Sequence, residues 1–105
     1  MRRGEVWTLR DDRFASKARP VVVVQSEEVD FNSTVVCLLT TFDSSEVPTR
    51  VLIRADESNG LLSDSYVITE KLAAVERGEF GQRLGQLTSK QMKHVAEGVA
   101  RVLGF

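Results

Sequence analysis

Short stretches of apolar and polar residues alternate along most of the chain, and this pattern predicts strands. Residues 20–25 contain four consecutive valines, whose β-branched side chains favour a strand that is buried on both faces. The same reasoning predicts further strands at residues 5–9, 34–41, 49–55, 65–70 and 80–87. Residues 72–75 fit a short helical turn or an extended link, and the pattern leaves both open. Gly81 and Gly85 are predicted to mark bulges or close approaches of the backbone.

The clearest pattern follows residue 87 and predicts a helix. Thr88 and Gln91 have the spacing of a capping box, and Gly104 is placed to end the helix. The apolar residues between them recur at helical spacing and form one face: Met92, Val95, Ala96, Val99, Val102 and Leu103. Six or seven short strands with a C-terminal helix predict a mainly β domain, built as a small barrel or a strongly bent sheet that the helix covers.

Composition indicates one domain over residues 1–105, because a chain of 105 residues buries one core. No apolar run approaches the roughly 18–20 residues that a membrane helix needs, and residues 1–5 lack the apolar stretch of a signal peptide, so a cytoplasmic location is expected. The single cysteine, Cys37, lies in a predicted buried strand and is expected to be a core residue. The single histidine, His94, is expected to be a packing or surface residue of the helix. One cysteine and one histidine leave no zinc site, and no metal or cofactor is expected.

The net charge of −1 argues at first against a nucleic-acid partner, but the charges are unevenly distributed. Residues 1–20 carry a net charge of +3, residues 21–60 a net charge of −5, and residues 61–105 a net charge of +1. The larger positive net charge therefore lies in residues 1–20, which include the polar segment at residues 10–18. This segment is predicted to be a loop that is long enough to carry function.

Few residues stand out as candidates for chemistry. Arg19 lies between the basic loop and a central strand, where a guanidinium is well placed to bind a phosphate with two donors. Thr40 and Thr41 end the next strand along the chain, and sequential strands tend to be neighbours. Glu70 and Lys71 follow another strand and form a possible acid and base. Taken alone, each of these residues fits an ordinary surface or strand-end role equally well or better, and they do not name a function.

An ordered set of short motifs resembles the MazF/PemK/Kid family of toxin endoribonucleases. The opening Arg-Gly-Glu-Val-Trp at residues 3–7 is similar to the family's first strand, and Arg19-Pro20 with the valines that follow is similar to its Arg-Pro strand. Thr40-Thr41 falls where the family has a strand-end threonine. Residues 81–92 resemble the family's last strand and the start of its C-terminal helix. The resemblance covers essentially the whole chain.

The resemblance implies a small SH3-like β-barrel that forms a homodimer and cleaves single-stranded RNA at short sequence motifs without a metal. It places the catalytic arginine on Arg19 and the catalytic threonine on Thr40. RNA supplies its own nucleophile, the 2′-OH, so the protein has mainly to stabilise the extra negative charge of a pentacovalent phosphorane. Arg19 is a poor general base because an arginine is almost never deprotonated at neutral pH, and Glu70 is the candidate carboxylate base. The expected products are a 2′,3′-cyclic phosphate and a 5′-hydroxyl.

The partners implied by the resemblance are RNA and an antitoxin. Arg13 and Lys17 of the basic loop are expected to bind phosphates, Phe14 to stack on a base, and Thr41 to contact RNA as well. The family's substrate groove is blocked by the acidic tail of a cognate antitoxin. Two features depart from the family, namely the acidic stretch at residues 27–30 and the absence of a glycine-rich sequence before Arg19. The alternative is a non-enzymatic toxin similar to CcdB, which has a related fold and binds DNA gyrase.

Overall fold

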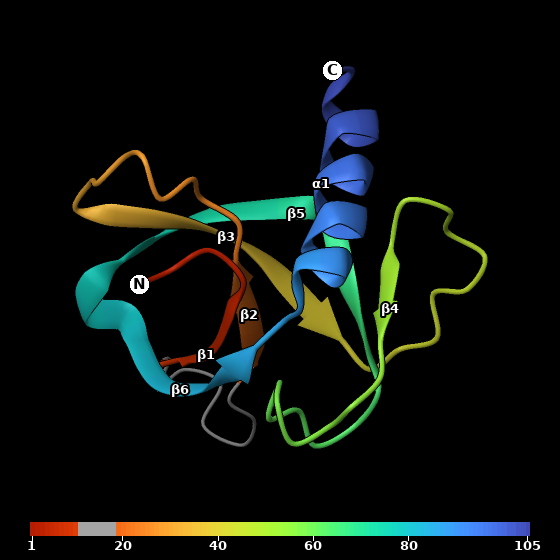
Figure 1. Cartoon of the computed structure of the whole chain (residues 1–105), viewed down its shortest axis with the longest axis horizontal. Coiled ribbons are helices and arrows are strands. Elements are labelled where there is room, and N and C mark those ends of the chain that lie inside the picture. Colours follow the sequence, from red (N-terminus) through yellow and green to blue (C-terminus); the bar gives the residue numbers. More distant parts are fainter. Residues whose placement is uncertain (11–18) are drawn as a thin grey trace.

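In its described part, residues 1–10 and 19–105, the protein forms an antiparallel six-stranded sheet that is followed by one α-helix (Figure 1). The computed structural model describes these ranges, so the predictions for Arg13, Phe14 and Lys17 fall outside the described residues. The strands are β1 (Glu5–Leu9), β2 (Pro20–Val23), β3 (Ser33–Thr40), β4 (Val51–Ile53), β5 (Ser65–Glu76) and β6 (Phe80–Gln86). The short 3₁₀ helix η2 (Arg77–Glu79) joins β5 to β6, and α1 (Ser89–Leu103) ends the described fold.

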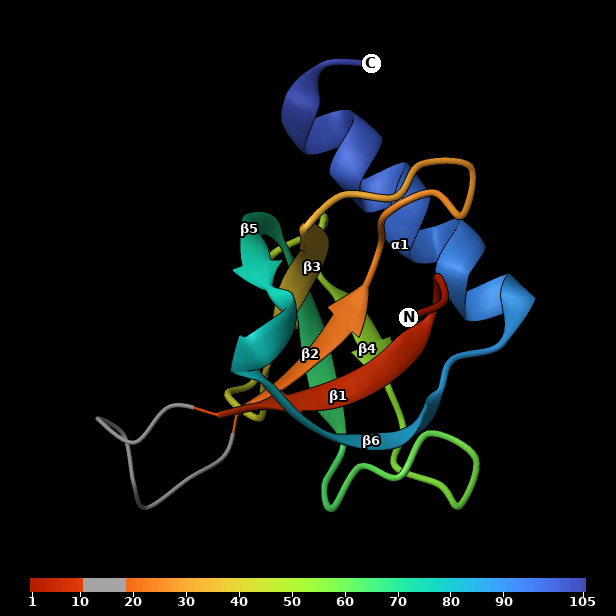
Figure 2. The same cartoon turned by 90° about the vertical axis from the view of Figure 1, so that its left-hand side faces the viewer.

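The strand order across the sheet is β4-β5-β3-β2-β1-β6. Figure 2 shows β1 between β2 and β6, with α1 packed to one side of the sheet. The prediction of a mainly β domain with a C-terminal helix is confirmed. Among the described residues the sheet is strongly bent and not fully closed, with β4 and β6 as its two edge strands, and it agrees with the small barrel-like domain that the resemblance implies.

A bulge in β5 bends the sheet where it pairs with β3. Cys37 of β3 pairs with Leu72, whereas the next residue, Leu38, pairs with Ile68. Three residues of β5, 69–71, therefore stand opposite no residue of β3. Residues 72–75 continue β5 beyond the bulge and are therefore extended. Because the bulge interrupts the alternation of apolar and polar residues, the sequence pattern left both a helical turn and an extended link open for them.

Two apolar clusters lie on the opposite faces of the sheet. One joins the sheet to α1 and includes Cys37, Val22 and Val95, all of which are fully buried. The other lies on the far face and includes Val21, Val23, Val36, Val75 and Phe80, with Trp7 packed against it. Trp7 meets Phe80 edge to face, with ring centroids 5.8 Å apart. The valines of β2 thus fill both clusters, as their unbroken apolar run predicted.

The ends of α1 match the sequence signals. The hydroxyl of Thr88 accepts a hydrogen bond from the backbone N–H of Gln91, and the Gln91 side chain accepts one from the N–H of Thr88. Gly104 caps the C-terminus in the left-handed conformation, with φ of 81°. Cys37 is buried and His94 is exposed on α1, 3.8 Å from Glu97, so both residues occupy the positions predicted for them.

Glycines allow two close approaches that shape the fold. A Cβ atom on Gly85 of β6 would lie 2.2 Å from the carbonyl oxygen of Ser58, so only glycine fits there. A Cβ atom on Gly98 of α1 would lie 2.5 Å from the carbonyl oxygen of Thr49. The strand β6 is also irregular against β1, with register shifts on both sides of Trp7. The prediction that Gly85 marks a close backbone approach is confirmed.

Candidate active site

Arg19 directly precedes β2 and Thr40 ends β3, so both residues lie at the same end of two paired strands. The antiparallel register of β2 and β3 pairs Val21 with Leu38. The paired residues end there, and the same register extended by two residues would bring Arg19, just outside β2, opposite Thr40. Because side chains alternate along a strand, Thr40 belongs to the sheet face that carries Val21 and Leu38, away from α1, and the extended register would put Arg19 on that face as well.

The hydroxyl of Thr40 is held by the turn that follows it. Its Oγ1 atom accepts a hydrogen bond from the backbone N–H of Phe42 at 3.1 Å. This bond uses a lone pair of the hydroxyl, so the hydroxyl proton can still be donated. Arg19 is exposed, and Thr41 is exposed directly after β3. A fixed hydroxyl and an exposed guanidinium at the same end of two paired strands are suited to binding a phosphate.

Glu70 forms an ion pair with Arg50, a residue that the sequence analysis did not single out. Nε of Arg50 lies 3.2 and 3.1 Å from the two carboxylate oxygens of Glu70, and Nη2 lies 2.5 Å from Oε2. The third nitrogen, Nη1, donates to Oγ of Ser44 at 2.9 Å. Ser44 is buried, and it lies in the loop between β3 and β4. The ion pair therefore joins the bulge of β5 to the loop that begins directly after Thr40.

The ion pair shifts the protonation equilibria of both partners in consistent directions. Hydrogen bonds from Arg50 hold the pKa of the Glu70 carboxyl below its usual range, and the Coulombic attraction of Arg50 adds to them. The same hydrogen bonds raise the pKa of Arg50. Glu70 is therefore ionised at neutral pH, as a proton acceptor must be, although a lowered pKa also weakens its basicity. Burial and, to a smaller extent, the nearby charge of Glu70 raise the pKa of the Cys37 thiol to about 12.

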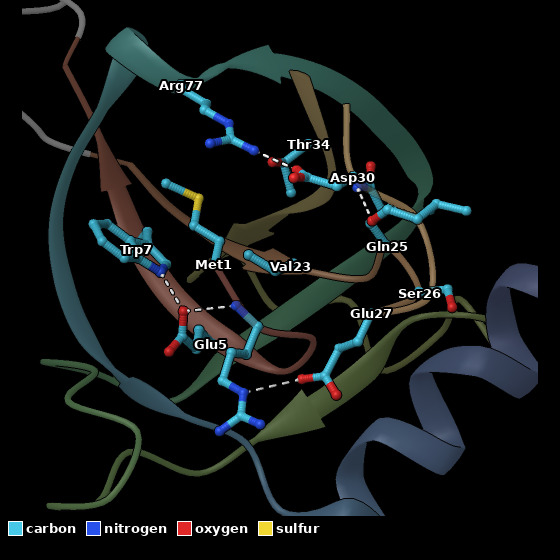
Figure 3. Close-up of a pocket in the computed structure, with 12 residues that line it drawn as sticks. Met1, Glu5, Trp7, Val23, Gln25, Ser26, Glu27, Asp30, Thr34 and Arg77 are labelled. Atoms are coloured by element: carbon cyan, nitrogen blue, oxygen red, sulfur yellow. Dashed lines mark hydrogen bonds and ion pairs between the residues drawn. The ribbon is translucent and has the colours of Figure 1, made fainter. Parts of the chain in front are cut away.

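A pocket of about 860 Å³ opens on the same face of the sheet, at the opposite end of β2 and β3 (Figure 3). Trp7 and Val23 form part of its wall, and Nε1 of Trp7 donates to Oε1 of Glu5 at 3.1 Å. Two ion pairs lie at its rim, Arg77 with Asp30 and Arg2 with Glu27, the latter at 3.4 Å. The acidic stretch at residues 27–30, which departs from the family pattern, is thus partly neutralised by arginines from two other segments.

Two features are absent from the described residues, namely a group of side chains that could bind a metal ion and a helix that could span a membrane. No three histidine, cysteine, aspartate or glutamate side chains within residues 1–10 and 19–105 gather into a group that could hold a metal ion. In the same part of the chain, no helix has the length and apolar character needed to span a membrane.

The fold is shared with solved structures of known toxins. It is shared with the Mycobacterium tuberculosis toxin MazF-mt6, with a TM-score of 0.80, 24% identity and coverage of 96% of this chain and 97% of that one. It is also shared with a MazF from Deinococcus radiodurans, with a TM-score of 0.78, 16% identity and coverage of 100% and 97%. The chain belongs to the family of PemK-like, MazF-like toxins of type II toxin-antitoxin systems, whose family model matches residues 2–103.

A curated relative agrees with this assignment over the full length of both chains. The probable endoribonuclease MazF of Mycolicibacterium smegmatis is 27% identical over 107 residues, which cover 100% of this chain and 98% of the relative. A mycobacterial endoribonuclease solved in complex with its cognate antitoxin has a TM-score of 0.82 and 24% identity, with coverage of 100% of this chain and 96% of that one.

Proposed function

We propose that this protein is an endoribonuclease toxin that cleaves single-stranded RNA at a short sequence motif, without a metal ion. The observation that carries the proposal is that Arg19 and Thr40 lie at the same end of the paired strands β2 and β3. The family membership and the relative named as a probable endoribonuclease support it.

In the proposed reaction the RNA attacks itself. The 2′-oxygen forms a bond to the adjacent phosphorus, the bond to the 5′-oxygen of the next nucleotide breaks, and a 2′,3′-cyclic phosphate remains. The 2′-OH gives up its proton to a base, and the leaving oxygen takes up a proton to become a 5′-hydroxyl. Arg19 and Thr40 donate hydrogen bonds to the non-bridging oxygens, whose negative charge increases in the transition state. Glu70 is the proposed proton acceptor, and it would have to act while bonded to Arg50 or after leaving it.

The proposed partners follow from the same assignment. A cognate antitoxin is expected to block the substrate groove with an acidic segment, and the proposal of such a partner is supported by the mycobacterial endoribonuclease of similar fold that was solved in complex with its cognate antitoxin. We also propose that the toxin works as a homodimer in the cytoplasm. Arg13, Phe14, Lys17 and Thr41 are the residues proposed to bind RNA beside the catalytic pair.

Cleavage of a long RNA in excess EDTA tests the proposal. We expect cuts at a short motif with 2′,3′-cyclic phosphate ends, because the nucleophile belongs to the substrate. Arg19→Ala should abolish cleavage, and Thr40→Ala should lower kcat by ~10²–10³, the usual cost of removing one oriented donor. Arg101→Ala is the control, because Arg101 is exposed on α1 and outside the site.

Two results would contradict the proposal in different ways. If Arg19→Ala keeps full activity, the site assignment is wrong although the enzyme class stands. If the pure protein cleaves no RNA and instead binds DNA gyrase tightly, the toxin acts like CcdB and is not a nuclease.

A further inference from the structure

Phe42, two residues after Thr40, exposes its aromatic ring to solvent. Phe42 is 76% exposed, in the loop that runs from β3 to β4 (Figure 1). Exposing so much of an apolar ring is unfavourable in water, by about 25 cal/mol per Å² of apolar surface. A large apolar side chain exposed beside a proposed active site is a candidate for contact with the substrate.

The backbone of Phe42 is fixed on both sides. Its N–H donates to Oγ1 of Thr40 at 3.1 Å, and its carbonyl oxygen accepts a hydrogen bond from the hydroxyl of Ser44 at 3.1 Å. Ser44 is itself buried and accepts a hydrogen bond from Arg50, which is tied to Glu70. A ligand that contacts the ring therefore does not have to order a flexible loop, so less entropy is lost on binding.

A carboxylate next to the ring is held in place as well. Oδ1 of Asp43 accepts hydrogen bonds from the N–H of Ser45 at 2.9 Å and from the hydroxyl of Tyr66 at 3.3 Å. Tyr66 is the β5 residue that pairs with Thr40. The bond from Ser45 lowers the pKa of Asp43, so the carboxylate is ionised at neutral pH. An ionised carboxylate can accept hydrogen bonds from the amino groups of adenine, cytosine or guanine.

From this arrangement we propose that Phe42 is a stacking platform for a nucleobase next to the scissile phosphate, and that Asp43 accepts a hydrogen bond from the edge of that base. The proposal rests on the proposed function, because the phosphate bound at Thr40 brings the base to Phe42. The hydrogen bond between Phe42 and Thr40 links the two positions directly. Stacking on an aromatic ring is tolerant of base identity, so Phe42 supplies affinity and Asp43 supplies preference.

Substitution of the ring separates its role from that of the catalytic pair. On an RNA that contains the mapped cut site, Phe42→Leu should raise KM by roughly 5- to 100-fold, the range for losing one stacked base. Its kcat should change by less than about threefold, because Leu removes only binding energy. Phe42→Trp should restore KM, since it restores the aromatic face. Phe31→Leu is the matched control, because Phe31 is 57% exposed but precedes β3, at the end away from Thr40.

A binding measurement makes the test independent of turnover. An oligonucleotide of the same sequence with 2′-O-methyl in place of the attacking 2′-OH cannot be cleaved, and 2-aminopurine can replace each base beside the cut site in turn. We expect a change of fluorescence on binding at one of these positions that Phe42→Leu abolishes and Phe42→Trp retains.

An unchanged KM and an unchanged signal in Phe42→Leu, with wild-type cleavage intact, would overturn this proposal and leave the proposed function standing. If Phe42→Leu instead weakens only binding of an antitoxin peptide or self-association, the ring is a protein contact and the proposal also fails. If the wild-type protein neither cuts nor binds RNA, the proposed function itself is lost.

Discussion

Two roles meet in the carboxylate of Glu70, which is the proposed general base and also the ion-pair partner of Arg50. As a general base it must be ionised, and its lowered pKa means that the activity it supports rises as the pH increases through a value below the usual range of a glutamate. Above that value the activity should be level until another group titrates.

Glu70→Gln tests the base directly. It should lower kcat by ~10²–10⁴ and remove the acidic limb of the pH profile of kcat/KM. Glu97→Gln, on the exposed side of α1, is the control. A loss smaller than about tenfold with an unchanged pH profile would leave Glu70 as an ion-pair partner of Arg50 and show that the base lies elsewhere.

The sequence pointed to Arg19 and Thr40 but not to Arg50, and the reason is physical. Arg19 comes just before one apolar run and Thr40 directly after another. At such positions the chain passes between the core and the surface, so side chains there reach the solvent. Arg50 is 20 residues from Glu70 in the sequence, and only the folding of β4 beside β5 brings them together. No spacing rule within one strand or helix connects two such residues.

Among the elements, α1 depends on a glycine for its place against the sheet. Gly98 is buried, and a Cβ atom there would lie 2.5 Å from the carbonyl oxygen of Thr49 and 2.8 Å from Cγ2 of Thr69. These two threonines are joined by a hydrogen bond of 2.7 Å from the Thr69 hydroxyl to the Thr49 carbonyl. The helix therefore packs at Gly98 against the hydrogen-bonded pair Thr49 and Thr69, and Thr49 directly precedes Arg50.

Gly98→Ala should lower the free energy of unfolding by about 1–2 kcal/mol. The better helix propensity of alanine, worth up to ~1 kcal/mol, is outweighed by the overpacking of a close backbone contact, which costs ~1–3 kcal/mol. Urea unfolding followed by circular dichroism measures the difference. Gly78→Ala is the control, because nothing lies within 4 Å of a Cβ atom there, and its change should stay within about 0.5 kcal/mol. A Gly98→Ala protein as stable as the wild type would show that the helix can move away without cost.

The strands and the helix were largely predictable because each carries its own signal. Four valines marked β2, and a capping box with apolar residues at helical spacing marked α1. The length of β5 was not predictable, since the bulge at residues 69–71 breaks its alternation and its far half pairs with β3 in a different register. Periodicity detects regular strands, whereas a bulge is decided by the partner strand.

At the scale of the whole molecule, the proposed homodimer can be measured without any substrate. Light scattering at micromolar concentration should give about 23 kDa, twice the 11.7 kDa of one chain. Dilution should reveal the dissociation constant as the mass falls. Particles of only about 12 kDa at micromolar concentration would contradict the dimer. Apolar residues exposed near the end of α1, Leu103 at 49% and Phe105 at 94%, leave surface that association would bury favourably.

The open sheet has a consequence for how the protein behaves at high concentration. The edge of a sheet offers unpaired backbone groups to which another chain can add a strand, and such additions lead to aggregates. Here one edge strand, β4, has only three residues and is flanked by Arg50 and Arg54. The other edge strand, β6, is irregular in its pairing with β1 and carries Arg83, which is bonded to Glu5. A short charged edge and an irregular one are poor templates for strand addition, so the protein can keep its sheet open and still resist assembling into fibres.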